Sequence, residues 1–300
     1  MKRRTFLATV PAVAVVNKLQ IENNENVFSC SSYNWRTFFK REGKVWGEDL
    51  DFDLTQFSKS GFKNIEYSIT SPEMAKRLIS VLKKFDIKMP SIYVNSVLHV
   101  EGEEDKSIKT ILEIAKVVRA YGTKIIVTNP NPIDWNKEIF KTDEQLKRQV
   151  KALDKLGAEL RKMGIKLAYH THTTEMLAGA KEIHHMLQNT RPENVGFCFD
   201  LHWIFRGSRD SEIAVFDIMK MYEDRIVELH IRQSESGVWK EEFTVNGDID
   251  YNKAAEYLGA KNIHAHIVLE QSIEKESTEN FTAISAHKEG LEALKACFGT

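Results

Sequence analysis

The sequence contains little of what several classes of protein require. Its three cysteines among 300 residues are too few and too scattered for a disulfide framework or a cage of thiolate metal ligands. Its formal net charge of −1 gives no electrostatic reason to expect a nucleic acid or an anionic membrane as a partner. After the N-terminus no apolar run approaches the length of a membrane span. With 42% hydrophobic and 28% charged residues, the chain has the composition of a soluble globular protein.

The first 20 residues are predicted to be an export signal. Arg3 and Arg4 precede a short, mildly apolar run at 8–16, which contains the small residues Ala12 and Ala14 near its end. The arginine pair resembles the start of twin-arginine signals, which carry folded proteins out of the cytoplasm. We therefore expect an exported, periplasmic protein whose residues 21–300 form one domain. Within that domain, Cys198 falls in a predicted buried strand, where a thiol usually behaves as a small hydrophobe.

The rest of the chain alternates short β-rich runs with amphipathic helical stretches. A glycine-rich phosphate turn after the first strand, which an open nucleotide-binding sheet would need, is missing. Most of the runs are apolar at both odd and even positions, so both faces of the strand would be apolar, as is typical of strands covered on both faces. Eight strand–helix repeats in about 275 residues match one closed barrel, so we expect a single (β/α)8 TIM barrel. The predicted strands are 27–33, 64–69, 89–95, 124–128, 166–172, 195–202, 225–232 and 266–271.

Several helix ends can be predicted from capping residues. Ser71 followed by Pro72 is typical of an N-cap and a first helical position. Thr142 begins a capping box for a long helix that should end at Gly164. Residues 108–120 also have helical spacing. These helices are the connections that a parallel barrel requires.

Acids and imidazoles end the last four predicted strands. Asp200, His230 and Glu270 each close an apolar run, at the strand end that faces the pocket of such a barrel. Each alone has an ordinary structural explanation, but their joint placement is costly unless something binds them. Two carboxylates and an imidazole suit one divalent ion such as Mn²⁺, Zn²⁺, Mg²⁺ or Co²⁺.

The fifth strand offers three candidates for a fourth ligand. His170 and His172 have the same parity, so both should point into the barrel mouth, and Glu175 lies on the turn just beyond. Glu175 would supply a hard oxygen ligand and a proton acceptor. It could equally be an acid at a helix N-terminus, stabilised there by the helix dipole.

Other polar residues near the strand ends are candidates for holding a substrate. A carboxylate at Glu66, on the second strand, could hold a sugar hydroxyl or form a salt bridge at the rim. Arg206 and Arg232 can donate hydrogen bonds to carbonyl or hydroxyl oxygens. Tryptophans 203 and 239 could be apolar platforms for a sugar or simply be packed. The predicted substrate-binding residues are Glu66, His172, His202, Arg206 and Arg232.

Taken together, five segments resemble the sugar phosphate isomerase/epimerase family, part of the xylose-isomerase-like TIM barrel superfamily. The resemblance extends over essentially the whole chain after the signal and is densest between the fifth and eighth strands. It is fairly specific for the superfamily and much less so for the reaction. The segments are 169–175, 199–203, 228–232, 247–251 and 268–271.

The resemblance implies a single divalent ion held by one side chain from each of strands five to eight. By position these are Asp200, His230 and Glu270, with Glu175 preferred as the fourth and His170 as its close competitor. Many relatives have glutamate at the position of His170. In keto-sugar epimerases of the superfamily two metal-bound glutamates form the acid–base pair, a role that here falls to Glu270 and to Glu175 or His170.

The predicted chemistry begins with removal of a proton next to a carbonyl group. A divalent ion bound to the carbonyl and a neighbouring hydroxyl would stabilise the resulting enediolate. Three functions follow: an isomerase or epimerase acting on a sugar or keto-sugar, a lyase or dehydratase acting on a keto-sugar or keto-glycoside, or a carbohydrate-binding barrel without activity. The expected partner is a small-molecule sugar, and export argues against a phosphorylated one.

Overall fold

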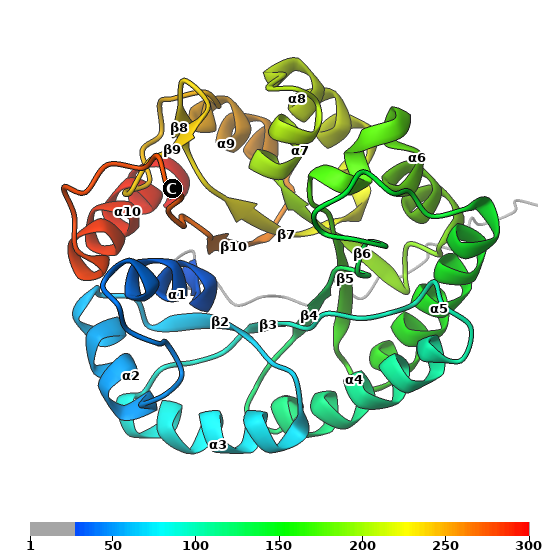
Figure 1. The fold of residues 1–300 in the computed structure, drawn as a ribbon, viewed down its shortest axis with the longest axis horizontal. Helices are drawn as coiled ribbons and strands as arrows, with labels where there is room; N and C mark the ends of the chain where they lie inside the picture. The colour runs from blue at the N-terminus through cyan, green and yellow to red at the C-terminus, as the bar shows by residue number, and fades with distance from the viewer. Residues whose placement is uncertain (1–27, 300) are drawn as a thin grey trace, which may run out of the picture.

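The protein forms a closed barrel of eight parallel strands, as the sequence predicts. The computed structural model describes residues 28–299. Around the barrel the strands follow the order β1-β10-β7-β6-β5-β4-β3-β2, and the helices form an outer ring around them (Figure 1). The predicted export signal at residues 1–20 lies outside the described residues.

The barrel strands lie close to their predicted positions, with helices between them. The strands are β1 (Phe28–Ser31), β2 (Asn64–Ser68), β3 (Ser91–Tyr93), β4 (Ile125–Thr128), β5 (Lys166–His170), β6 (Val195–Asp200), β7 (Ile226–Ile231) and β10 (His266–Leu269). The helices are α1 (Ser32–Arg41), α2 (Leu50–Lys59), α3 (Pro72–Leu82), α4 (Glu103–Arg119), α5 (Asp143–Lys162), α6 (Thr173–Asn189), α7 (Leu201–Gly207), α8 (Glu212–Met221), α9 (Tyr251–Ala260) and α10 (Ala283–Phe298). Two short 3₁₀ helices, η1 (Lys83–Phe85) and η2 (Glu223–Arg225), precede β3 and β7.

The predicted caps explain where several helices begin and end. The Ser71 side chain accepts a hydrogen bond from Met74 N–H, and Pro72 occupies the first turn of α3. Thr142 and Gln145 form a reciprocal capping box at the start of α5. Gly164 follows α5 with a φ of +71°, a conformation that glycine adopts without steric cost. Local sequence chemistry therefore sets the lengths of these connections.

Some predicted strands extend too far at the mouth of the barrel. The sixth strand was expected to reach His202, but β6 ends at Asp200 and α7 begins at the next residue. The reason is that Asp200 caps this helix, with its Oδ1 accepting the N–H of Trp203 at 2.8 Å. His202 therefore lies on a helix instead of a strand end.

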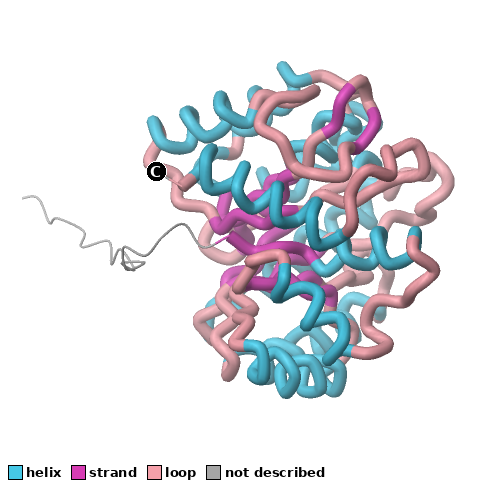
Figure 2. The backbone as a smooth tube through the Cα atoms, turned by 90° about the vertical axis from the view of Figure 1, so that its left-hand side faces the viewer, coloured by secondary structure: helices cyan, strands magenta, loops and turns pink. Residues whose placement is uncertain are grey.

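An additional hairpin stands over the mouth. β8 (Ser234–Glu235) and β9 (Val238–Trp239) pair antiparallel between β7 and β10, and the sequence analysis did not predict them. In the side view the hairpin lies apart from the barrel strands, among the loops at one end of the barrel (Figure 2). It places Trp239 beside His202 on α7 and against the guanidinium group of Arg232, which directly follows β7.

The pairing of β6 with β7 contains an irregularity next to the mouth. The register shifts between Phe197 and Cys198, so that Cys198 lies opposite Glu228 and Asp200 lies opposite His230. Bulges of this kind often re-aim side chains near functional sites. Here the shift places two layers of polar side chains across from each other.

The barrel closes along a seam between its first and last strands. β1 pairs with β10, and Asn34 Nδ2 donates to the carbonyl of Leu269 at 2.9 Å. Outside the strands, Arg41 and the fully buried side chain of Glu241 form an ion pair at 2.7 Å. The Glu241 carboxylate also accepts hydrogen bonds from the loop before α10. None of the helices within residues 28–299 combines the length and apolar character needed to cross a bilayer.

Candidate metal and active site

Four buried side chains from neighbouring strands converge at the carboxyl end of the barrel. His170, Asp200, His230 and Glu270 each offer one ligand atom, and these atoms all lie within 4.8 Å of one another. They end or closely follow β5, β6, β7 and β10, which are consecutive around the barrel. This four-residue group brings together three of the four predicted metal ligands and adds His170.

Local contacts leave one face of each side chain free for the group. Asp200 uses Oδ1 to cap α7, while its Oδ2 lies 3.4 Å from His170 Nε2. Glu270 Oε2 lies 3.5 Å from His230 Nδ1 and accepts a hydrogen bond from Arg232 at 2.9 Å. Contacts within the fold therefore position these side chains and still leave a ligand atom of each one available.

The far side of His230 is held by two acids deeper in the barrel. Its Nε2 lies 3.3 Å from Glu66 Oε2 and 3.3 Å from Glu228 Oε1. A carboxylate on the second ring nitrogen fixes the tautomer and orientation of a metal-binding imidazole. Glu66, predicted to contact substrate or form a rim salt bridge, is 1% exposed and meets His230. Glu228 was not singled out in the sequence, although it has the same strand parity as His230.

The group contains polar atoms that are buried without hydrogen bonds. Among the described residues, both ring nitrogens of His170, Oδ2 of Asp200 and Nδ1 of His230 have no hydrogen-bond partner. Such atoms are costly and rare in native proteins unless a ligand or water satisfies them. One ligand atom from each of these residues belongs to the cluster within 4.8 Å, which indicates that the group is built to bind something.

Burial and neighbouring charges shift the pKa values of the four residues in different directions. It lowers the pKa of His170 to about 3, so the ring is neutral and keeps a lone pair. Burial raises the pKa of Asp200 to about 6. For Glu270 burial alone would raise the pKa, but His230 and Arg232 hold it below its usual value. For His230 burial alone would lower the pKa, but the neighbouring thiol and acids raise it well above its usual value, so the ring has to give up a proton before it can bind an ion. With that proton lost, two imidazoles and two carboxylates form a donor set that fits Mn²⁺, Co²⁺ or Zn²⁺.

Glu175 differs from its predicted place in the ligand set. Its Oε2 accepts the backbone N–H of His172 at 2.7 Å, and its Oε1 accepts the side chain of Asn129 at 3.1 Å. It thus completes a capping box at the start of α6, the structural alternative considered for this residue. Both oxygens are used in this way, and His170, the competing candidate, takes the fourth place in the group, for which Glu175 was preferred.

Arg232 is the predicted substrate-binding residue with the clearest free donor. Its Nε donates to the backbone carbonyl of Glu270 at 2.7 Å and its Nη2 to the Glu270 carboxylate. Its Nη1 is buried with no partner among the described residues. The guanidinium group therefore orients Glu270 and retains one donor for a ligand oxygen.

The other predicted arginine and one predicted histidine have protein partners. Arg206 donates to both oxygens of Glu274, at 3.0 and 2.7 Å, and to the carbonyl of Gly237. His202 is fully buried and its Nε2 lies 2.8 Å from Ser234 Oγ. His202 contacts Ser234 of β8 and Arg206 contacts Gly237 in the turn between β8 and β9, so the two side chains hold the hairpin over the mouth.

Aromatic rings border the group. The ring of His172 lies 4.8 Å from that of His170 and 5.2 Å from those of Trp135 and Trp203. Trp239 is buried under the guanidinium groups of two arginines, at 4.4 and 4.0 Å, so its faces are covered. Trp203 stays a candidate platform, and Trp135, which the sequence analysis missed, is 53% exposed.

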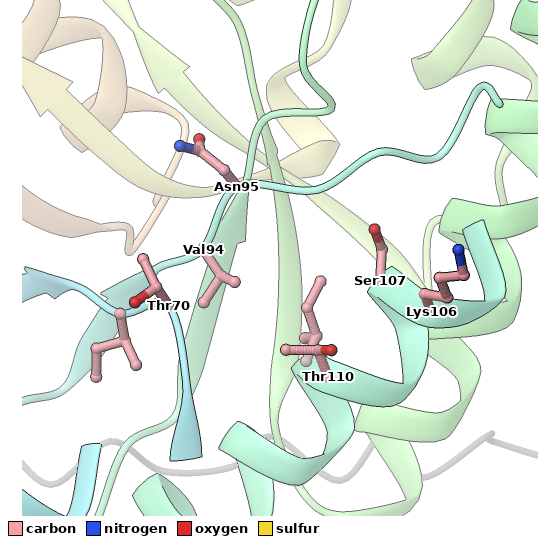
Figure 3. A pocket seen from close by; sticks show the side chains of 8 residues that line it. Thr70, Val94, Asn95, Lys106, Ser107 and Thr110 are labelled. Carbon is pink, nitrogen blue, oxygen red and sulfur yellow. The ribbon is translucent and has the colours of Figure 1, made fainter. Parts of the chain in front are cut away.

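Two hollows lie beside the mouth, on the side of β1 to β3. One, of about 220 Å³, lies between the ends of β2 and β3 and the start of α4, with Thr70, Asn95 and Ser107 in its lining (Figure 3). The other, of about 530 Å³, is lined by residues of α1, the α1–α2 loop and α3, with Trp46 and Tyr67 among them. Neither includes a member of the four-residue group.

The comparison with protein families decides the assignment of the chain. Residues 54–297 match the family model of the xylose isomerase-like TIM barrel. The chain belongs to this family. The match includes all four members of the group and confirms the resemblance found in the sequence.

Proteins that resemble this chain carry several enzyme names. An inosose dehydratase of Mesomycoplasma hyopneumoniae (strain 7448) is 26% identical over 251 residues, covering 75% of this chain and 82% of the relative. A sugar phosphate isomerase/epimerase of Parabacteroides distasonis has a similar structure, with a TM-score of 0.69, 16% identity and coverage of 94% and 99%. An L-ribulose 3-epimerase has a TM-score of 0.67, 16% identity and coverage of 90% and 94%. The solved structures confirm the fold.

Proposed function

We propose that this protein is a divalent-metal-dependent enzyme that removes a proton next to the carbonyl group of a keto-sugar. The observation that carries the proposal is the four-residue group, with its unpartnered buried ligand atoms at one point. When bound there, a divalent ion would stabilise negative charge that develops on the substrate oxygens. His170, Asp200, His230 and Glu270 are the residues that would hold it.

Glu270 is the proposed base. Its carboxylate faces the group and is held by Arg232 at 2.9 Å, in an environment that keeps its pKa below the usual value. It is therefore ionised at neutral pH, which is the form that a base requires. The free Nη1 of Arg232 would donate to a substrate oxygen beside the same carbon.

We propose elimination, as in a dehydratase or lyase, as the outcome of the reaction. Epimerisation needs a second group that returns the proton to the other face. A metal-bound carboxylate keeps a second oxygen for this task, whereas a metal-bound imidazole has no free lone pair. Since His170 replaces a carboxylate and Asp200 uses its second oxygen to cap α7, Glu270 is the carboxylate of the group that is left to act as a base. The proton that Glu270 takes from the α-carbon can then pass to the hydroxyl or glycosidic oxygen that leaves the β-carbon, so that water or an alcohol is released. The inosose dehydratases that resemble this chain in sequence support the same choice.

Isomerase or epimerase activity is the second candidate. His172 lies beside His170, and its Nδ1 is buried without a partner among the described residues. β5, which precedes it, is three strands away from β10 around the barrel, so His172 and Glu270 approach the mouth from different sides. Such a pair of groups is what a proton transfer between two faces would require.

Proton NMR in deuterated water separates these outcomes. The Mn²⁺-loaded protein is incubated with keto-inositols, free keto-sugars and keto-glycosides. We expect exchange at the α-carbon followed by an unsaturated or dehydrated product, or release of the glycosidic alcohol. A stereoisomer of unchanged composition would support the epimerase instead. Absence of exchange on every substrate, with metal bound, would contradict the proposed function.

Export stays a proposal that rests on the arginine pair and the apolar run behind it. Replacing Arg3 and Arg4 together by lysine should leave the precursor in the cytoplasm of a host with twin-arginine transport. Immunoblotting of periplasmic and cytoplasmic fractions measures this. A wild-type protein that stays cytoplasmic with Met1 intact would refute the proposal.

A further inference from the structure

One thiol lies inside the barrel directly below the four-residue group. Cys198 precedes Asp200 by two residues on β6, so both side chains face the barrel interior. The residue is fully buried, and its Sγ lies 3.9 Å from Glu228 Oε1, one of the oxygens that contact His230. Its environment therefore differs from that of a thiol packed only among apolar side chains.

This thiol completes a second set of potential metal ligands. One atom each of His170, Cys198 and His230 lie within 4.8 Å of one another. The set shares both imidazoles with the four-residue group and offers a sulfur atom where that group offers two carboxylates. Both ring nitrogens of His170 are buried without a hydrogen bond among the described residues, which is an independent sign that this ring awaits a ligand.

The other two cysteines provide a contrast. Cys30 donates to the carbonyl of Ser31 and accepts from Asn34. Cys297 lies near the C-terminal end of α10, half-buried, and donates to the carbonyl of Tyr251. Neither belongs to a cluster of ligand atoms found among the described residues.

We propose that His170, Cys198 and His230 form a second metal site, which takes thiophilic divalent ions such as Cd²⁺ and Zn²⁺. This inference rests on the proposed function in one respect, because both sites use the same imidazoles. Thiolate and imidazole ligands favour these softer ions, whereas the two carboxylates of the four-residue group favour Mn²⁺. Three protein ligands leave a fourth position open.

The ligands of the thiol site have two consequences for metal binding. A neutral imidazole has one lone pair, so an ion in the thiol site excludes an ion from the four-residue group. Binding at the thiol site also breaks the S–H bond of Cys198, forms a metal–sulfur bond and releases the proton to solvent. A thiophilic ion should therefore displace Mn²⁺ from the protein one for one.

Cadmium titration of the full-length protein tests the site through the ultraviolet absorption of a thiolate–Cd²⁺ bond. We expect one such band per chain, saturating with one Cd²⁺, together with release of one bound Mn²⁺ measured by its electron paramagnetic resonance signal. Cys198→Ser should abolish the band. It should also weaken Cd²⁺ binding by at least about 10-fold, because even the loss of a group that only supports a metal ligand lowers the affinity by about that factor. Its Mn²⁺ affinity should change by less than about 3-fold, since the hard ligands are intact.

Matched variants make the test decisive. Cys30→Ser and Cys297→Ser should retain the band, and Asp200→Asn should weaken Mn²⁺ binding while the band persists. Cys198→Ala serves as a second variant if the serine protein is poorly folded by circular dichroism. A band retained in both Cys198 variants, or Cd²⁺ and Mn²⁺ bound to one chain together, would overturn the inference. Failure of the proposed function looks different: the wild type would then catalyse no exchange with Mn²⁺ bound, whatever Cd²⁺ does.

Discussion

The two halves of the barrel mouth end their strands in polar residues but use them differently. On the β1–β4 half, Ser31 Oγ accepts the N–H of Tyr33, and Thr128 Oγ1 donates to the carbonyl of Val94 and lies 2.9 Å from Ser96 Oγ. On the β5–β10 half, His170 and Asp200 keep buried atoms without partners. These hydroxyls of the first half cap a helix and join neighbouring strand ends. Atoms such as Asn129 Oδ1 are unpartnered on that half too, but only the second half gathers such atoms, among the described residues, from four strand ends into one cluster of ligand atoms.

Glu66 is the exception that connects the halves. It belongs to β2, yet its carboxylate reaches across the barrel to His230. The contrast indicates that the clustering of unpartnered ligand atoms, more than residue type, distinguishes a ligand-binding strand end from a structural one. Breaking either half should therefore have different consequences, which the following substitutions measure.

The largest effect should come from removing an imidazole of the β5–β10 half. His230→Ala should abolish stoichiometric divalent metal binding and with it α-proton exchange, because both the ligand and its contacts with Glu66 and Glu228 are lost. Elemental analysis of protein purified without chelator measures occupancy, with circular dichroism to confirm folding. His184→Ala, which removes a histidine bonded to Tyr222 on the outer face, is the control and should keep its metal. Full occupancy in His230→Ala would reassign this residue to a structural role.

Glu270→Gln should slow exchange by about 10²–10⁴ while metal remains bound, because an amide cannot accept the proton but still offers one oxygen. The rate of deuterium incorporation into the substrate measures this. Gln keeps the shape of the side chain, so the contact with Arg232 should survive. Exchange at the wild-type rate would show that the base is another group, with His172 and Glu175 the next to test.

Glu228→Gln should weaken metal binding by about 10–100-fold, the usual effect of altering a group that orients a metal-binding histidine. The Glu228 carboxylate contacts His230 Nε2 at 3.3 Å and carries no contact with the outer ligand atoms. Isothermal titration with Mn²⁺ measures the affinity. Glu223→Gln, at the partly exposed opposite end of β7, is the matched control. An unchanged affinity would mean that Glu66 alone orients the ring.

The smallest effect should come from the β1–β4 half. Thr128→Val leaves the carbonyl of Val94 and the hydroxyl of Ser96 without this partner, which should lower the free energy of unfolding by about 1–3 kcal/mol. Urea denaturation measures the loss. Because Thr128 lies outside the group, Mn²⁺ affinity should stay the same. A marked loss of metal binding would show that the two halves are not independent.

Much of this architecture could be predicted from local sequence, because each feature depends on neighbouring residues. The apolar strands, the cap at Ser71 and the capping box at Thr142 follow from period and side-chain chemistry. Asp200 and Glu270 could be found for the same reason, since each ends an apolar run.

Features that depend on distant partners could not be predicted. Glu175 looks like a ligand until Asn129, from another strand end, and the His172 N–H take both its oxygens. Arg206 looks free until Glu274, 68 positions later, binds it. The neighbours of Cys198 depend on a register shift that has no local signature. In each case the sequence indicates the chemistry of a side chain but not the group that meets it.

The seam between β1 and β10 bears on how the chain assembles. Its contacts join residues far apart in sequence, as with Asn34 and Leu269 or Arg41 and Glu241, and long-range pairings of this kind form slowly. The four ligand residues, in contrast, come from one continuous stretch that ends at Glu270. We expect the four consecutive strands that carry them to associate first and to gather an ion before the barrel closes. The order of folding would then decide which cation the finished protein first contains, until an ion that binds more tightly displaces it.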